Sequence, residues 1–314
     1  MKKIIVLGSV LGLLCACAGM NKNTVSYQMS KYDQHIYYVV SGEGPTKEEA
    51  SVAALDHMRK NLRQNVVEAE NLPEVNDLIS NAKIAKVWKD KSNKSAKNYF
   101  ALAVLKRENA EKILQRPINE LDLRLYSLAE KLNISNEKFA GLKSAFAMES
   151  LIVKRNIYQD LYMFVSQDRV GYETEKFEGL KKRYNDRLAS IKVAVMVRGA
   201  EENAVLLSRI VDAVNKMGLS AVSPDDPTAL LCVEVDASVD GYESERLKGL
   251  EWAATSASVS LCDLEADSIF ARFNVYDRAG TGRRADSLRK SMEGVGNKAS
   301  VEVVERLKNY LKTK

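Results

Sequence analysis

The chain has 314 residues, of which 46% are hydrophobic and 28% are charged. This length suffices for two modest domains with buried cores, and its 47 Lys and Arg are interspersed with 42 Asp and Glu. Nucleic-acid-binding proteins usually concentrate their basic residues on one face, so the composition argues against nucleic acid as a partner.

Catalytic and metal-binding signals are scarce. The two histidines, His35 and His57, provide little of the commonest metal ligand and acid–base group. The sequence also has no nucleophile elbow, phosphate-binding Gly-Lys loop or His-Glu-x-x-His helix. We therefore expect a non-enzymatic protein with no cofactor and no metal. The alternative is a carboxylate-dependent enzyme acting on cell wall or lipid, which would need converging carboxylates with perturbed pKa values.

The N-terminus has a basic start and an apolar run over residues 4–14, too short to span a bilayer, which is typical of an export signal. Small Ala16 followed by Cys17 resembles the lipobox of bacterial lipoproteins. That resemblance implies that Cys17 takes a diacylglycerol and becomes the mature N-terminus. Cys15 is a poorer candidate because bulky Leu14 would precede the cleavage site. An ordinary secretory peptide with incidental cysteines is the alternative.

The destination also follows from this resemblance. Ala18 stands where aspartate commonly retains lipoproteins at the inner membrane of enteric-type bacteria, so an outer-membrane, periplasm-facing anchor is implied. Residues 1–16 are then the signal peptide. Residues 17–35 are polar without a sustained period and predict a flexible tether. No later run approaches the roughly 18 apolar residues of a second membrane segment.

Residues 36–106 predict an N-terminal α+β domain. A β-branched strand over 36–41 ends at the Gly-rich turn 42–45, and Thr46 with Glu49 has the spacing of a helix capping box. The next helix has a small-residue face suited to close packing on a sheet. That face is Ala50, Ala53, Ala54, Met58 and Leu62. A short helix over 73–82 and two strands over 84–89 and 99–106, joined by a hairpin turn at 90–97, complete the domain, with Trp88 as a packing residue.

Residues 36–132 carry a family resemblance. Its motifs are Gly42-Glu43-Gly44, Thr46-Lys47-Glu48-Glu49-Ala50, Ala53-Ala54, Val87-Trp88 and the strand 99–105. These resemble the Lpp twenty-kilodalton family of bacterial envelope lipoproteins, which includes flagellum-associated members. The resemblance implies an α+β module with an envelope or motility role and carries over no catalytic residue.

Residues 107–190 predict a helical hairpin or bundle. Apolar residues alternate spacings of four and three in the first helix, with Pro117 marking either a kink or a new start. These are Leu114, Ile118, Leu121, Leu125, Leu128 and Leu132. Two further helices carry apolar faces at Phe139, Leu142, Phe146, Val153, Ile157, Leu161 and Phe164, and at Phe177, Leu180, Tyr184 and Leu188. The three faces either satisfy each other or form an intermolecular coiled coil, which would mean self-association.

Residues 191–314 predict a C-terminal α+β domain in the order β-α-β-β-β-α. A strand at 191–197 precedes a helix at 201–217, which Gly218 ends, and a short strand at 219–222 follows. Alternation over residues 231–237, 253–261 and 269–275 predicts three antiparallel strands, and residues 301–311 a final helix. The predicted class is α+β: two small domains with antiparallel sheets, separated by the helical segment.

The C-terminal region resembles the periplasmic domains of curli-secretion and penicillin-binding-protein activator lipoproteins. The resemblance rests on residues 254–264, 273–280 and a glycine-flanked final helix from Gly294. Residues 280–284, Gly-Thr-Gly-Arg-Arg, predict a solvated hairpin turn, with an anionic-polymer site as the alternative.

Two further cysteines, Cys232 and Cys262, face each other if Val233 pairs with Leu261 in adjacent antiparallel strands. An exported protein meets oxidising conditions, so a disulfide is chemically available and would stabilise the domain by roughly 3 to 4 kcal/mol. Two free thiols covered by a helix are the alternative.

Together these patterns predict a lipid-anchored, non-enzymatic scaffold or assembly protein of the cell envelope, linked to a surface appendage or a wall-associated complex. Its expected partners are the membrane, through the lipid, and an envelope protein, with self-association through the helical seam left open.

Overall fold

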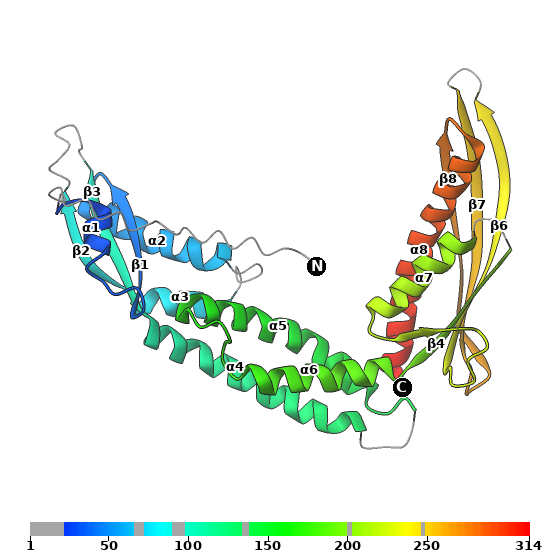
Figure 1. The fold of residues 1–314 in the computed structure, drawn as a ribbon, viewed down its shortest axis with the longest axis horizontal. Coiled ribbons are helices and arrows are strands. Elements are labelled where there is room, and N and C mark those ends of the chain that lie inside the picture. Colours follow the sequence, from blue (N-terminus) through cyan, green and yellow to red (C-terminus); the bar gives the residue numbers. More distant parts are fainter. Residues whose placement is uncertain (1–21, 66–71, 90–97, 134–137, 200–202, 246–248) are drawn as a thin grey trace. The chain divides into compact units, whose positions relative to one another are not determined.

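The computed structural model describes residues 22–65, 72–89, 98–133, 138–199, 203–245 and 249–314. Helices and antiparallel-rich sheets form an α+β fold, which confirms the predicted class (Figure 1). The chain groups into two compact units, Met1–Pro117 with Ile157–Tyr172, and Ile118–Asn156 with Glu173–Lys314. Their boundaries lie inside the helices that the sequence predicts as a separate segment at 107–190. Among the described residues, no helix has the length and apolarity needed to cross a membrane.

The first unit contains a three-stranded antiparallel sheet in the order β1-β3-β2 (Figure 1). Its elements are α1 (Val25–Met29), β1 (Tyr37–Gly44), α2 (Lys47–Asn65), α3 (Pro73–Asn81), β2 (Lys83–Lys89) and β3 (Tyr99–Lys106). The Thr46 hydroxyl accepts from the Glu49 amide at 3.1 Å, as the capping-box spacing predicts. The predicted turn at 90–97 lies outside the described residues.

Gly42 and Gly44 belong to strand β1, which corrects the prediction that they form a turn ending it. They provide room for α2, because a Cβ on Gly42 would lie 2.1 Å from the backbone nitrogen of Ala54. A Cβ on Gly44 would lie 2.6 Å from that of Ala50. Ala50 and Ala54 are fully buried, so small residues on both elements let helix and sheet approach closely.

The described end of the predicted tether packs against the sheet, which corrects the expectation of a flexible segment through residue 35. Helix α1 covers the sheet face that carries Trp88, with Val25 and Met29 packed on its apolar cluster. The Trp88 indole donates to the Asn23 carbonyl at 2.7 Å. A five-residue helix is too short to show a period in sequence, so only its packing on Trp88 reveals it.

Three long helices follow, α4 (Arg107–Glu130), α5 (Leu142–Ser166) and α6 (Thr174–Ala189), with a short 3-10 turn η2 (Lys131–Asn133). Helix α4 continues through Pro117 without a break. The predicted buried face of α5 is wrong at Val153, which is 49% exposed. The fully buried residue at this level of the helix is Arg155 instead. Arg155 Nε lies 2.9 Å from Asp122 Oδ1, so an ion pair makes a cation tolerable inside the helices.

The C-terminal part of the second unit contains a five-stranded sheet in the order β5-β4-β6-β7-β8 (Figure 1). Its elements are β4 (Lys192–Gly199), α7 (Asn203–Lys216), β5 (Ser220–Val222), β6 (Leu231–Glu245), β7 (Leu250–Asp263), β8 (Ser268–Thr281) and α8 (Arg284–Thr313). Strands β6, β7 and β8 are antiparallel as predicted, with Val233 opposite Leu261. The sheet is mixed, however, because β4 runs parallel to both β5 and β6.

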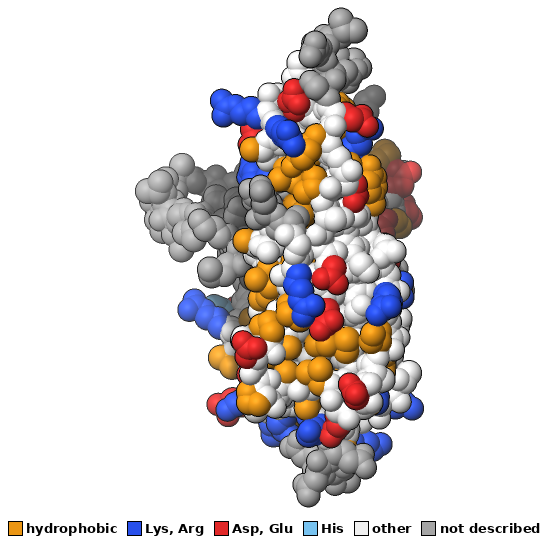
Figure 2. All heavy atoms as spheres, turned by 90° about the vertical axis from the view of Figure 1, so that its right-hand side faces the viewer, with side chains coloured by type: hydrophobic (Ala, Val, Ile, Leu, Met, Phe, Trp, Pro, Cys, Tyr) orange, Lys and Arg blue, Asp and Glu red, His pale blue; other side chains and the backbone are white. Residues whose placement is uncertain are grey.

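Helices α7 and α8 cover one face of this sheet and leave the other open (Figure 1). The open face carries serines of β7 and side chains such as Asp236 and Arg272, and Figure 2 shows its acidic and basic groups interspersed.

The predicted face of β8 is wrong at Ile269, which is 53% exposed. The register slips between Leu261 and Cys262, so Phe270 has no partner on β7. Such a bulge reverses which residues face the helices. Phe270 accordingly stacks on Tyr310 of α8, with ring centroids 3.8 Å apart.

Helix α8 begins at Arg284 and runs for 30 residues. This corrects both predicted starts, residue 301 from the apolar pattern and Gly294 from the resemblance. Gly294 and Gly296 lie inside it and permit close contacts. A Cβ on Gly294 would meet the Asp277 carboxylate of β8, and one on Gly296 would lie 3.1 Å from Arg209 Cγ of α7. Glycine here serves packing rather than marking a helix start.

Candidate functional site

The open edge of strand β8 is the candidate site. Strand β8 is the last strand of the sheet, and its neighbour on one side is β7. Along its other side runs a groove of about 640 Å³. Its walls are residues Phe273 to Tyr276 of β8 and Asn297, Lys298, Val301, Glu302 and Arg306 of α8.

The α8 wall presents both apolar and charged side chains to this groove. Val301 is 66% exposed although it is hydrophobic. Arg306 pairs with Glu302 at 3.0 Å, and its guanidinium lies 4.8 Å from the ring centroid of Phe273. The Lys298 ammonium donates to the Tyr276 carbonyl and to the Asp277 carboxylate, each at 2.8 Å. Such a wall suits a polypeptide segment better than a compact polar metabolite.

Sequence reasoning did not identify this groove, because it predicted the last helix only from Gly294 or from residue 301 onward. A signal was present in the apolar spacing of three and four residues that extends back from that helix. Leu288, Met292, Val295 and Ala299 follow this spacing, and all four are buried.

A second hollow, of about 430 Å³, lies among α5, α6, α7 and α8 within the second unit. Phe146, Met217 and Val304 are among its apolar lining residues. Lys308 pairs there with Glu149 at 2.5 Å. Burial, with a smaller contribution from the Glu149 charge, raises the pKa of Tyr184 to about 12, so its phenol stays protonated. The ion pair engages Glu149, one of the two carboxylates that line this hollow; the other is Asp212.

The predicted site residues fall into two groups. Cys17, with its lipidation, lies outside the described residues, as does Cys15. Cys232 and Cys262 face each other across β6 and β7, in the predicted register. Both are free thiols, and burial, followed by a hydrogen bond with Cys262, raises the pKa of Cys232. Their bonding in the oxidised protein stays a prediction.

The two histidines lie in different settings in the first unit. Nδ1 of His57 is hydrogen-bonded to the Ser41 carbonyl at 2.9 Å, and the backbone of His35 bonds to Asp33. Within the described ranges, no three His, Cys, Asp or Glu side chains gather as metal ligands.

The buried carboxylates have structural partners. Burial raises the pKa of Asp122, although its hydrogen bond to Arg155 acts in the opposite direction. Burial alone would also raise the pKa of Asp263. Donation from the Tyr310 hydroxyl and from nearby backbone N–H groups outweighs burial and holds that pKa below its ordinary value. Neither carboxylate lines the hollows described above.

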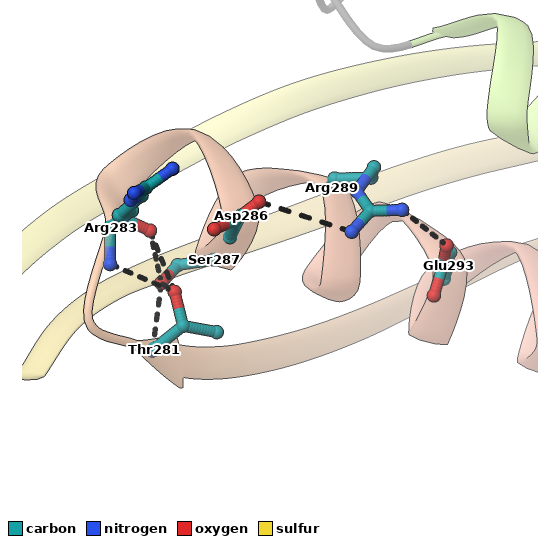
Figure 3. A network of polar contacts seen from close by, with 6 residues as sticks. All are labelled: Thr281, Arg283, Asp286, Ser287, Arg289 and Glu293. Carbon is teal, nitrogen blue, oxygen red and sulfur yellow. Dashed lines mark hydrogen bonds and ion pairs between the residues drawn. The ribbon is translucent and has the colours of Figure 1, made fainter.

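Residues 280–284 connect β8 to α8, which corrects the prediction of a hairpin turn. Figure 3 shows the Thr281 and Ser287 side chains meeting the backbone of Arg283 at the start of α8. The Thr281 amide donates to the Ser287 hydroxyl at 2.9 Å. The Arg284 guanidinium lies 3.4 Å from the ring centroid of Tyr242. These contacts begin the helix, and of the two arginines that the anionic-polymer alternative would use, Arg284 lies against an aromatic ring.

No family model and no curated protein matches the chain. Among solved structures, the secreted protein HP1454 of Helicobacter pylori is 15% identical, with a TM-score of 0.35, over 84% of this chain and 98% of its own. A minor lipoprotein of Acinetobacter baumannii is 8% identical, with a TM-score of 0.30, over 39% of this chain and 96% of its own. Lipoprotein GNA1162 of Neisseria meningitidis is 10% identical, with a TM-score of 0.27, over 38% of this chain and 99% of its own. At these scores the likeness carries no argument about family or activity.

Proposed function

We propose that this protein is a lipid-anchored, non-enzymatic scaffold of the bacterial cell envelope. It is held at the outer membrane through Cys17, faces the periplasm, and binds another envelope protein. The observation that carries the proposal is the apolar run ending in Ala16 and Cys17. A lipid confines the protein to a surface, which favours an encounter with a partner on the same membrane.

The chemistry of the folded part supports a binding role. Two buried carboxylates are engaged within the fold, Asp122 in an ion pair with Arg155 and Asp263 in a hydrogen bond from Tyr310. The groove beside β8 presents Val301, which is 66% exposed, along a strand edge. Lys298 and Arg306 lie beside it, each in an ion pair with a neighbouring carboxylate. The resemblance of residues 36–132 to the Lpp twenty-kilodalton family is consistent with work in a surface-appendage or wall-associated assembly.

Labelling of intact cells with a fatty-acid probe tests the anchor. We expect wild-type protein and Cys15→Ser to be labelled and Cys17→Ser to remain unlabelled. Labelling of Cys17→Ser together with loss of label from Cys15→Ser would show that the assigned cleavage site is wrong.

Incubation of purified protein with peptidoglycan and with ester substrates tests the absence of catalysis. We expect no turnover above a buffer blank. Turnover that a single Asp or Glu substitution abolishes would overturn the scaffold proposal. Crosslinking in intact cells would then identify the protein or wall component that the scaffold holds.

A further inference from the structure

We propose that the edge of β8 between Phe270 and Tyr276 binds an extended, acidic segment of a partner protein as an added β-strand. The proposal deepens the proposed function, because it gives the scaffold a docking site and a partner chemistry. Strand addition to an open sheet edge is an established mode of peptide recognition: main-chain hydrogen bonds provide affinity, and alternate side chains provide specificity.

The contact between Lys298 and Tyr276 shows which backbone groups point away from the sheet. Lys298 reaches the Tyr276 carbonyl from α8, so that carbonyl points toward the groove rather than toward β7. In an antiparallel strand, the N–H and C=O of one residue point to the same side, and alternate residues repeat the pattern. The N–H and C=O groups of Arg272 and Asn274 therefore also point outward, ready for a further strand.

Two features limit the usable length of this edge. At one end, the bulge at Phe270 interrupts the ladder and changes the strand direction. At the other end, the Lys298 ammonium occupies the Tyr276 carbonyl. Bulges and lysines are common means by which proteins prevent uncontrolled pairing of strand edges. What remains open is a short segment centred on Asn274, about the length of a peptide strand.

The groove provides contacts for the side chains of the added strand. Side chains on its α8 side would cover Val301, which is 66% exposed, and would meet the half-buried Phe273. Side chains on its other side would lie next to Asn274 and Tyr276, and the Tyr276 ring is 52% exposed. Alternation of apolar and polar residues in the partner would match these two environments.

Charge favours an acidic partner over a second copy of this chain. Arg272, Lys298 and Arg306 border the open segment, against Asp277 and Glu302, which leaves an excess of one positive charge. Lys298 and Arg306 each pair with one of these carboxylates, and Arg272 donates to the Ser260 hydroxyl of β7 at 3.1 Å. A two-fold pairing of two β8 strands that sets Asn274 opposite Tyr276 would place Arg272 opposite Arg278, whereas a pairing centred on Asn274 would place Arg272 opposite Tyr276 and gain no charge attraction. Like charges directly opposite each other destabilise a strand pair, whereas glutamates of another protein would be attracted to the same surface.

The test uses the full chain in detergent micelles and a fluorescent nine-residue peptide of alternating Val and Glu, monitored by anisotropy. We expect saturable binding. Asn274→Pro removes an outward N–H, a change that strand edges tolerate, and should weaken binding about tenfold or more. The matched control, Asn274→Thr, keeps the N–H and should bind within about twofold of wild type.

A peptide with Lys in place of Glu tests charge and should bind at least about tenfold more weakly. The Arg306→Glu variant should bind the Glu peptide more weakly, although its strand edge is unchanged. This variant keeps the test valid if Asn274→Pro fails to fold. Hydrogen exchange should show protection of residues 272–276 on binding.

Equal binding of the Glu and Lys peptides, or unchanged binding by both Asn274→Pro and Arg306→Glu, would overturn the proposal. So would a dimer, detected by sedimentation, that Asn274→Pro dissociates. Failure of peptide binding with normal labelling of Cys17 would reject the docking site alone. Loss of Cys17 labelling with intact peptide binding would reject the anchor alone.

Discussion

Replacing Gly42 by alanine would separate helix α2 from strand β1. The added Cβ would lie 2.1 Å from the Ala54 nitrogen and 2.6 Å from both the Ala53 carbonyl carbon and the Ala54 Cα. These neighbours are backbone atoms of a helix, so no side-chain rotation relieves the contact. Truncating Ala54 to glycine would not relieve it either, because the nitrogen and Cα remain in place.

The size of the effect follows from these distances. Ordinary van der Waals contact begins at about 3.4 Å, so helix and strand must part by more than about 1 Å. Such a shift disturbs buried residues of both elements, among them Val40 of β1 and Ala50 of α2. Overpacking a dense core by one methyl group costs typically about 1–3 kcal/mol, and we expect Gly42→Ala to reach at least the upper part of that range.

Chemical denaturation of the full chain without its lipid measures this loss. The two compact units can unfold in separate transitions, so hydrogen exchange should assign the change to α2, β1 and β3. Gly179→Ala is the matched control, because nothing lies within 4 Å of its added Cβ and it stands inside helix α6. That variant should be stabilised by about 0.5–1 kcal/mol. A loss below about 0.5 kcal/mol for Gly42→Ala would refute the close approach of α2.

Two further predictions concern buried charge. Asp122→Ala should cost about 3–5 kcal/mol because it leaves the Arg155 guanidinium buried without its carboxylate, whereas the double variant Asp122→Leu with Arg155→Met should cost less; denaturation midpoints that rank them the other way would contradict this. The depressed pKa of Asp263 provides stability that is present above its unfolded value of about 3.9 and is lost as the pH falls through the folded pKa. Asp263→Asn should remove that part of the acid dependence, measured as denaturation midpoint against pH, and an unchanged profile would show that Asp263 does not contribute to it.

The periodicity of apolar residues correctly predicts the strands in which buried and exposed residues alternate regularly. The alternation in β6 and β7 predicts which residues are buried, and a slip of one residue would reverse the faces. The structure has the register assumed for the two cysteines, with Val233 opposite Leu261. The bulge at Phe270 departs from that rule, because a ring stack with Tyr310, some forty positions later, decides it. A local pattern holds no information about such a distant partner.

The predicted roles of two glycines also differ from the structure. The common roles of glycine predict a turn at Gly42 and a helix start at Gly294. In the structure each is a point where two elements approach too closely for a side chain. The sequence shows that a Cβ is missing but not which element occupies the vacant space. The candidate groove was missed for a related reason, since its helical wall includes the residues directly after Gly294 and Gly296.

The two thiols of the C-terminal sheet should differ in reactivity. The thiolate is the nucleophile, and burial raises the pKa of Cys232, whereas Cys262 is only half-buried. In reduced, folded protein we therefore expect maleimide to modify Cys262 first and Cys232 only on unfolding. Equal rates, or modification of Cys232 first, would contradict the burial that the structure gives.

Thiol counting on denatured, unreduced protein addresses the bond itself. Directly opposed residues in an antiparallel pair have Cα atoms about 4.5–5.5 Å apart, within the range that disulfides span. Distance therefore permits the bond between Cys232 and Cys262, and the orientation of the two Cβ atoms decides whether it forms. Loss of both thiols in wild type, with one thiol appearing in Cys262→Ser, indicates an intramolecular disulfide. Two thiols in wild type indicate that the reduced pair of the structure persists after export.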